Sequence, residues 1–174
     1  MSSSELSIED ALAIAINLHK AGDLEEADLY YTAILKVNPN HPDACHNLGV
    51  IASSLQKYSL ATDFFKKAID HSPNIEQFWI SAVKNLAAEK NINELKLLKL
   101  QLYRKDLDHP AQASIIRLLE VVISEVSAGL LEAEILSLFH NEEYASVVET
   151  FNIKSENVIP SLKTLNIFGA SLIE

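Results

Sequence analysis

Two stretches of the sequence carry the same pattern: residues 22–39 read GDLEEADLYYTAILKVNP, and residues 56–73 read QKYSLATDFFKKAIDHSP. They lie 34 residues apart, and the same kinds of residue return in the same order in both. These are a small residue, an aromatic ring and a closing proline (Ala27, Tyr31 and Pro39, then Ala61, Phe65 and Pro73). Agreement at many positions with one fixed offset indicates a repeat array.

Each repeat contains two helical segments. Residues 8–20 have apolar side chains on one stripe, at the 3.6-residue spacing of an amphipathic helix. Proline cannot continue the backbone ladder of a helix, so we expect Pro39 and Pro73 to end the second helix of each pair. Three pairs of polar residues have the spacing of helix-capping boxes (Ser7 with Asp10, Asp23 with Glu26, Asn91 with Glu94).

This pattern resembles the tetratricopeptide repeat. Two repeats are clear in residues 8–75, where the residues in family order are Asn47, Leu48, Gly49, Tyr58, Ala61, Phe65, Ala68 and Pro73. A third, degenerate repeat is predicted over residues 76–109, with Trp79 at the usual aromatic position but Leu95 and Lys99 replacing the small and aromatic residues of its second helix. The resemblance implies an all-α, right-handed superhelical solenoid of helix-turn-helix pairs.

The domain organisation that we expect from this register has five parts. They are a disordered N-terminus (1–7), three repeats (8–109), an extra helix (110–127), a further tetratricopeptide-like repeat (128–161) and the first helix of a truncated repeat (162–174). The last helix of a solenoid normally turns a polar face to solvent, whereas this one is rich in apolar residues. We therefore expect either that the chain is a fragment of a longer protein or that another chain covers this face.

The composition limits the classes of partner. The formal net charge is −10, which repels phosphate backbones, so nucleic acid is not an expected partner. No apolar run approaches ~20 residues, so no membrane-spanning segment is expected. The start lacks the features of a signal peptide, and the single cysteine is compatible with a reducing compartment. We expect a cytoplasmic protein.

The stretch 40–47, NHPDACHN, contains the residue types of a metal or nucleophilic site. In the repeat register, however, residues 40–42 form the turn between repeats, and Asp43 opens the next helix. Cys45 and His46 are adjacent, so their side chains point about 100° apart and do not converge on one ion. We interpret this stretch as an inter-repeat turn. The sequence has no phosphate loop and no catalytic motif, so we expect no metal, no cofactor and no enzymatic activity.

Stacked helical pairs form extended surfaces that bind segments of other proteins. Family resemblance implies that the first helix of each pair lines the concave side, where the expected peptide-binding residues are Leu12, Ile16, His19, His46, Asn47, Val50, Ser53, Gln77, Ile80 and Lys84. The leading hypothesis is therefore a non-catalytic module that binds a peptide or partner helix there. Family members that hold acidic C-terminal tails use basic and amide residues, of which only Asn47 is present here.

Two alternatives remain open. The order of repeats is similar to the N-terminal region of large bacterial glycosyltransferase- or sulfotransferase-type multidomain proteins, which implies a substrate-docking or scaffold arm of a larger transferase. The other alternative is self-assembly into a homodimer through the apolar C-terminal helix that contains Leu165 and Phe168.

Overall fold

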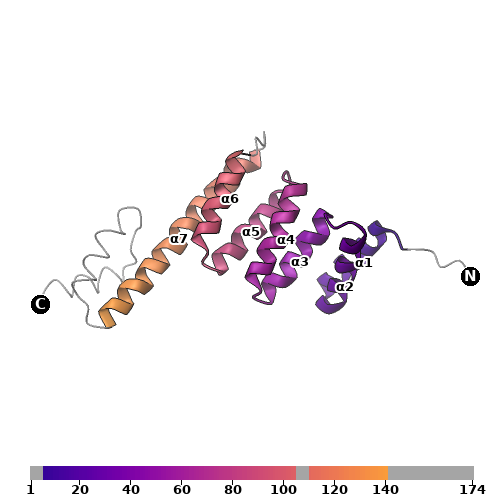
Figure 1. Ribbon diagram of the computed structural model, residues 1–174, viewed down its shortest axis with the longest axis horizontal. Coiled ribbons are helices and arrows are strands. Elements are labelled where there is room, and N and C mark those ends of the chain that lie inside the picture. The colour runs from indigo at the N-terminus through magenta and orange to yellow at the C-terminus, as the bar shows by residue number, and fades with distance from the viewer. Residues whose placement is uncertain (1–5, 105–109, 141–174) are drawn as a thin grey trace, which may run out of the picture. The chain divides into compact units, whose positions relative to one another are not determined.

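The computed structural model describes residues 6–104 and 110–140, and every regular element in them is an α-helix (Figure 1). The first six helices form three consecutive hairpins, and one long helix follows them. They are α1 (Ile8–Ala21) with α2 (Leu24–Val37), α3 (Pro42–Ser54) with α4 (Tyr58–His71), α5 (Glu76–Ala88) with α6 (Ile92–Arg104), and then α7 (Pro110–His140). The predicted all-α fold of stacked helix pairs is confirmed.

The turn inside each hairpin repeats with the sequence period. Gly22, Gln56 and Lys90 lie 34 residues apart, and all three have a positive φ, of 91°, 59° and 58°. In each turn this residue donates its backbone N–H to the carbonyl three positions earlier, at 3.1, 2.9 and 3.0 Å. The left-handed conformation suits glycine and strains other residues. The second and third turns nevertheless adopt the geometry of the first turn without a glycine.

Two of the three predicted helix caps form. The backbone N–H of Asp10 donates to the Ser7 hydroxyl at 3.0 Å, and that of Glu94 donates to the Asn91 amide oxygen at 3.2 Å. The capping box predicted at Asp23 was wrong, since this side chain makes no capping hydrogen bond. The Gly22 turn already orders the chain here, because the N–H of Asp23 donates to the carbonyl of Leu18 at 3.0 Å.

Small residues allow the helices of a pair to approach closely. Ala15, Ala27 and Ala61 have no exposed surface. In the second hairpin, a Cβ built on Gly49 of α3 would lie 2.7 Å from the Phe65 ring of α4. A side chain at position 49 would therefore collide with the Phe65 ring, so this position requires glycine.

Two buried side chains of α5, those of Trp79 and Asn85, help to fasten the third hairpin to the second. The fully buried indole of Trp79 in α5 donates from Nε1 to the carbonyl of Pro73 at 2.7 Å. The amide of Asn85, which is 1% exposed, donates to the carbonyl of Tyr58 at 3.0 Å and to the Thr62 hydroxyl at 2.9 Å. Buried polar groups of this kind are costly unless they are paired, so these bonds fix how α5 sits on α4.

The predicted helix boundary at residues 127 and 128 was wrong, because α7 runs without interruption from Pro110 to His140. No proline follows Pro110 in this helix, and Gly129 alone costs only about 1 kcal/mol, too little to end a helix of 31 residues. The expected repeat over 128–161 lies mostly outside the described residues, and the truncated repeat over 162–174 and residues 1–5 lie entirely outside them.

The chain divides into two compact units between Ile116 and Arg117, within α7. The start of α7 therefore belongs with the three hairpins. Ile115 is buried, and the Gln112 side chain donates to the carbonyl of Leu102 in α6 at 3.1 Å. Within residues 6–104 and 110–140, no helix combines the length and apolar character needed to cross a bilayer.

The contact between Gly49 and Phe65 predicts opposite outcomes for two glycine substitutions. Gly49→Ala should destabilise the protein by about 1–3 kcal/mol, because the added methyl group must displace a buried ring. Gly129→Ala, also within a helix but with nothing within 4 Å, should be neutral or stabilising by up to ~1 kcal/mol. Urea unfolding followed by circular dichroism measures both, and equal effects of the two substitutions would contradict the steric role of Gly49.

Candidate functional site

The ten residues predicted from the sequence to bind a peptide lie on α1, α3 and α5, and none of them is buried. Gln77 and Lys84 are exposed, and the other eight are half-buried. We call the surface that these ten residues form on the first helices of the hairpins the first-helix face. Partial exposure of apolar side chains such as Ile16, Val50 and Ile80 is what a binding surface requires, because a fully buried side chain has no surface left to offer.

His46 lies at the junction between the second and third hairpins. Its ring stacks on that of Phe78 in α5, with centroids 4.7 Å apart and planes 25° apart, and lies 5.7 Å from the Phe65 ring. Its Nε2 lies 2.9 Å from the Ser81 hydroxyl. Burial lowers the pKa of His46, and this effect exceeds the opposite influence of the Asp43 carboxylate. The imidazole is therefore neutral at physiological pH and acts as a flat, polar-edged ring.

His19 brings a second imidazole to the same face from α1. Its ring meets that of Tyr31 edge to face, with centroids 6.2 Å apart. Burial lowers the pKa of His19 as well. Burial first, and then the Asp43 carboxylate, raise the pKa of Tyr31 to about 12, and its hydroxyl has no hydrogen-bond partner among the described residues. Both imidazoles of this face are therefore held in the uncharged form.

Hydrogen bonds already engage several polar groups of the face. The Gln77 amide donates to the Ser81 hydroxyl at 3.2 Å, which links it to His46. The Asn47 amide donates to the carbonyl of Asp43, one turn earlier in α3, at 2.9 Å. The polar part of this face is thus an ordered network of neutral groups, with Lys84 as its basic residue.

A hollow of about 210 Å³ opens on the face beside His46. Its lining combines apolar side chains, hydroxyls and one ammonium (Val50, Ser53, Ser54, Phe65, Ser81 and Lys84). Pockets for small organic ligands generally hold about 300–1,000 Å³, so this hollow is too small for most of them. Its volume corresponds to one or two amino-acid side chains.

The residues around Cys45 form a helix start. His41 caps α3, because its Nδ1 accepts a hydrogen bond from the N–H of Ala44 at 3.4 Å, and the helix begins at Pro42, one residue before the predicted start at Asp43. Cys45 is fully buried, and burial raises the pKa of its thiol. In the part of the chain that the structure describes, no three His, Cys, Asp or Glu side chains are grouped closely enough to hold a metal ion.

The predicted binding residues did not include Phe65, Phe78 or Ser81, which lie beside this face; Ser81 was noted only as a position at which relatives carry a basic or amide residue. Ser81 lies one helical turn after Gln77, so helical spacing alone points to it. The roles of the two rings depend on how α4 and α5 approach α3, which helical periodicity within each segment does not specify.

Comparisons with known proteins agree with the fold. The tetratricopeptide repeat family model matches residues 12–41 and 42–75, so the chain carries two tetratricopeptide repeats in its first two hairpins. A solved tetratricopeptide repeat protein from Parabacteroides merdae is similar over 98% of this chain and 73% of its own, with a TM-score of 0.52 and 11% identity. A structure from Bacteroides ovatus aligns over 96% of this chain and 97% of its own, with a TM-score of 0.35 and 12% identity. No curated protein matches the chain. The repeats indicate a protein-interaction or scaffold module.

The neutral histidines predict a pH-dependent stability. Because the pKa values of His19 and His46 in the folded protein lie below the ordinary 6.5, the unfolded chain binds more protons at mildly acidic pH. The free energy of unfolding should therefore fall as the pH drops from about 7.5 to about 5.5, with the full stability present well above 6.5.

Urea unfolding across this pH range measures the effect. His46→Gln should flatten the pH profile, whereas His71→Asn, at an exposed position on α4, serves as the control. An unchanged profile in His46→Gln would show that this imidazole is not held neutral by its surroundings.

Proposed function

We propose that this chain is a non-catalytic protein-interaction module that binds a peptide or a partner helix on its first-helix face, the expected concave side of the solenoid. The single observation that carries the proposal is the hollow beside His46, where half-buried apolar side chains meet polar groups of defined geometry. Such a combination favours an apolar anchor with neighbouring hydrogen bonds, the usual form of peptide recognition.

The residues that line the hollow indicate which kind of peptide segment would bind there. An apolar side chain of the ligand enters between Val50 and the Phe65 ring, and its surroundings there are apolar. The hydroxyls of Ser53 and Ser81 lie at the same hollow and serve a ligand backbone. Lys84 makes no ion pair within the described residues, so it can take a carboxylate placed near the anchor. The ligand is therefore a segment with an apolar anchor and a nearby acidic or polar group.

The other two hypotheses have no support in the described residues. The homodimer contact at Leu165 and Phe168 lies outside them. The similarity to the N-terminal regions of glycosyltransferase- or sulfotransferase-type proteins is not matched by any of the comparisons. We do not propose either function.

A substitution in the hollow tests the proposal. Peptides selected from a random library against the folded chain should bind Val50→Glu at least ~10-fold more weakly, a loss of about 1.4 kcal/mol, because a carboxylate would then occupy the apolar anchor site. Fluorescence anisotropy measures the affinities, and circular dichroism confirms that the variant is folded. Leu29→Glu is the matched control, since this leucine is 68% exposed on α2, a second helix of a hairpin. Equal binding to Val50→Glu and to the unmodified chain would refute the proposed site.

The terminal group of the bound peptide should not matter. Leu12, Ile16, Gln77 and Ser81 occupy positions at which relatives that hold C-terminal carboxylates carry basic or amide residues, and one Asn47 amide hydrogen is already bonded to Asp43. Selected peptides should thus bind within about twofold whether the C-terminus is free or amidated, since each lost charge-assisted bond would cost about 1.5–3 kcal/mol. Calorimetric titration of both forms decides this, and a free acid that binds tenfold better would contradict it.

A further inference from the structure

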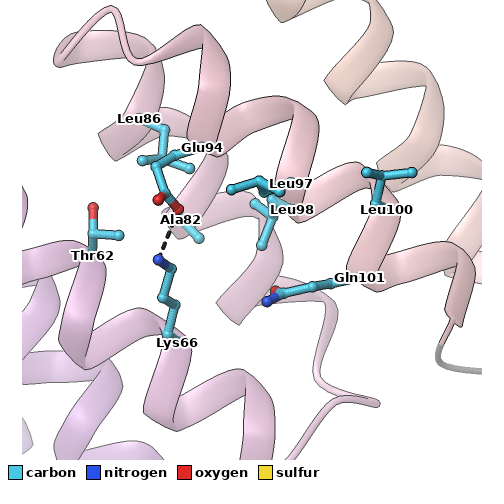
Figure 2. A pocket seen from close by; sticks show the side chains of 9 residues that line it. All are labelled: Thr62, Lys66, Ala82, Leu86, Glu94, Leu97, Leu98, Leu100 and Gln101. Atoms are coloured by element: carbon cyan, nitrogen blue, oxygen red, sulfur yellow. Dashed lines mark ion pairs between the residues drawn. The ribbon is translucent and has the colours of Figure 1, made fainter.

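A second hollow, of about 180 Å³, lies between α4, α5 and α6 (Figure 2). Leu97 and Leu98 of α6 reach into it, and Ala82 and Leu86 of α5 line it from the adjacent helix. The remaining lining residues are polar or lie at its edge (Thr62, Lys66, Glu94, Leu100 and Gln101). Lys66 and Glu94 form an ion pair of 2.7 Å across it, from α4 to α6. The hollow is thus predominantly apolar, with its two flanking charges already neutralised by each other.

The repeat register explains why this hollow exists. Leu98 lies 34 residues after Phe64, so the two occupy equivalent positions in consecutive second helices. Phe64 packs its ring against the core of the first three helices. Leu98 is 3% exposed and is buried at its own junction, but its side chain is shorter than a phenylalanine ring. An aromatic ring is therefore missing from the α4–α6 junction, and the interior is left unfilled.

Next to the hollow, α6 exposes three large apolar side chains. Leu97, Leu100 and Tyr103 are 50%, 53% and 55% exposed, and their spacing of three residues places them along one side of the helix. Single exposed apolar residues are common on protein surfaces, but a contiguous row beside an apolar hollow marks an interaction site.

The charge of this part of the chain selects the partner. Residues 84–105 contain six basic and two acidic residues, a local charge of +4 in a chain of net charge −10. One of the two acidic residues, Glu94, is paired with Lys66. On α6 itself, Lys96 is exposed and Lys99 lies with its ammonium 6.0 Å from the centre of the Tyr103 ring. A partner of complementary charge is acidic.

We infer that the hollow and the row formed by Leu97, Leu100 and Tyr103 bind an acidic amphipathic helix of another protein. The apolar face of this helix lies on the row, one aromatic or aliphatic side chain enters the hollow, and a carboxylate faces the exposed Lys96. This is the helix-in-groove mode of recognition. Nucleic acid is a poor partner, because an apolar hollow has no group that binds phosphate and the net charge of −10 repels a phosphate backbone. The inference does not depend on the first-helix face.

A set of three labelled helical peptides tests the inference by fluorescence anisotropy on the whole chain. The first carries a leucine and phenylalanine stripe with a net charge of about −4, the second replaces the stripe with serine, and the third replaces each glutamate with lysine. Only the first should bind saturably, with a Kd below ~100 μM that rises with salt. Absence of binding by the first peptide, or equal binding by the serine peptide, would overturn the inference.

Substitutions locate the binding site. Leu98→Phe restores the ring found one repeat earlier and fills the hollow, so it should weaken binding at least ~10-fold while the melting temperature stays the same or rises. Leu100→Ser changes only the exposed row and should also weaken binding, which covers the case in which Leu98→Phe disturbs the core. Leu29→Ser, at an exposed leucine of α2, is the control and should bind normally.

Two further measurements distinguish this surface from the first-helix face and from a contact between two copies of the chain. Val50→Glu, on the first-helix face, should leave the affinity for the acidic peptide unchanged, so the two proposed sites succeed or fail separately. Sedimentation of the chain alone should show no self-association that depends on this surface. Self-association that is lost in the Leu98→Phe variant would assign the surface to a second copy and overturn the inference. Unchanged binding in both Leu98→Phe and Leu100→Ser would overturn it as well.

Discussion

The close contact between Gly49 and the ring of Phe65 joins the core of this protein to the first-helix face. The absence of a side chain at Gly49 lets the ring lie against α3, and this brings α4 close to α3 in the second hairpin. The same ring lies 5.7 Å from His46 and lines the hollow of the first-helix face. One aromatic side chain therefore serves the packing of the hairpin and the shape of the surface, so a change in one alters the other.

The two proposed surfaces arise in different ways from one repeat. The hollow on the first-helix face lies where the regular second hairpin meets the third. The hollow between α4 and α6 lies where the irregular third repeat meets the second, beside Leu98, which occupies the position of Phe64 one repeat earlier. In a solenoid each repeat contacts its neighbours alone, so one altered residue opens a local gap without unfolding the array. Degeneration of a repeat can thus create a surface that regular repeats lack.

The sequence was sufficient for the hairpins, because a 34-residue period combines many weak signals at fixed spacing. It also predicted the caps at Ser7 and Asn91, which depend on residues three positions apart. It failed at residue 128, where the repeat register indicated a new helix but α7 continues. The one glycine nearby, Gly129, costs too little to end a helix of this length. The stacking of His46 on Phe78 was not predictable, because it depends on how two helices meet rather than on either helix alone.

The positive φ angles at Gln56 and Lys90 have a consequence for how the array comes apart. A left-handed conformation costs an ordinary residue roughly 1–2 kcal/mol, whereas Gly22 adopts it freely. This strain energy is released when the hairpins that contain Gln56 and Lys90 open. Backbone strain is therefore distributed unevenly among the three turns. The backbone conformation of the turns at Gln56 and Lys90 therefore costs energy that the turn at Gly22 does not.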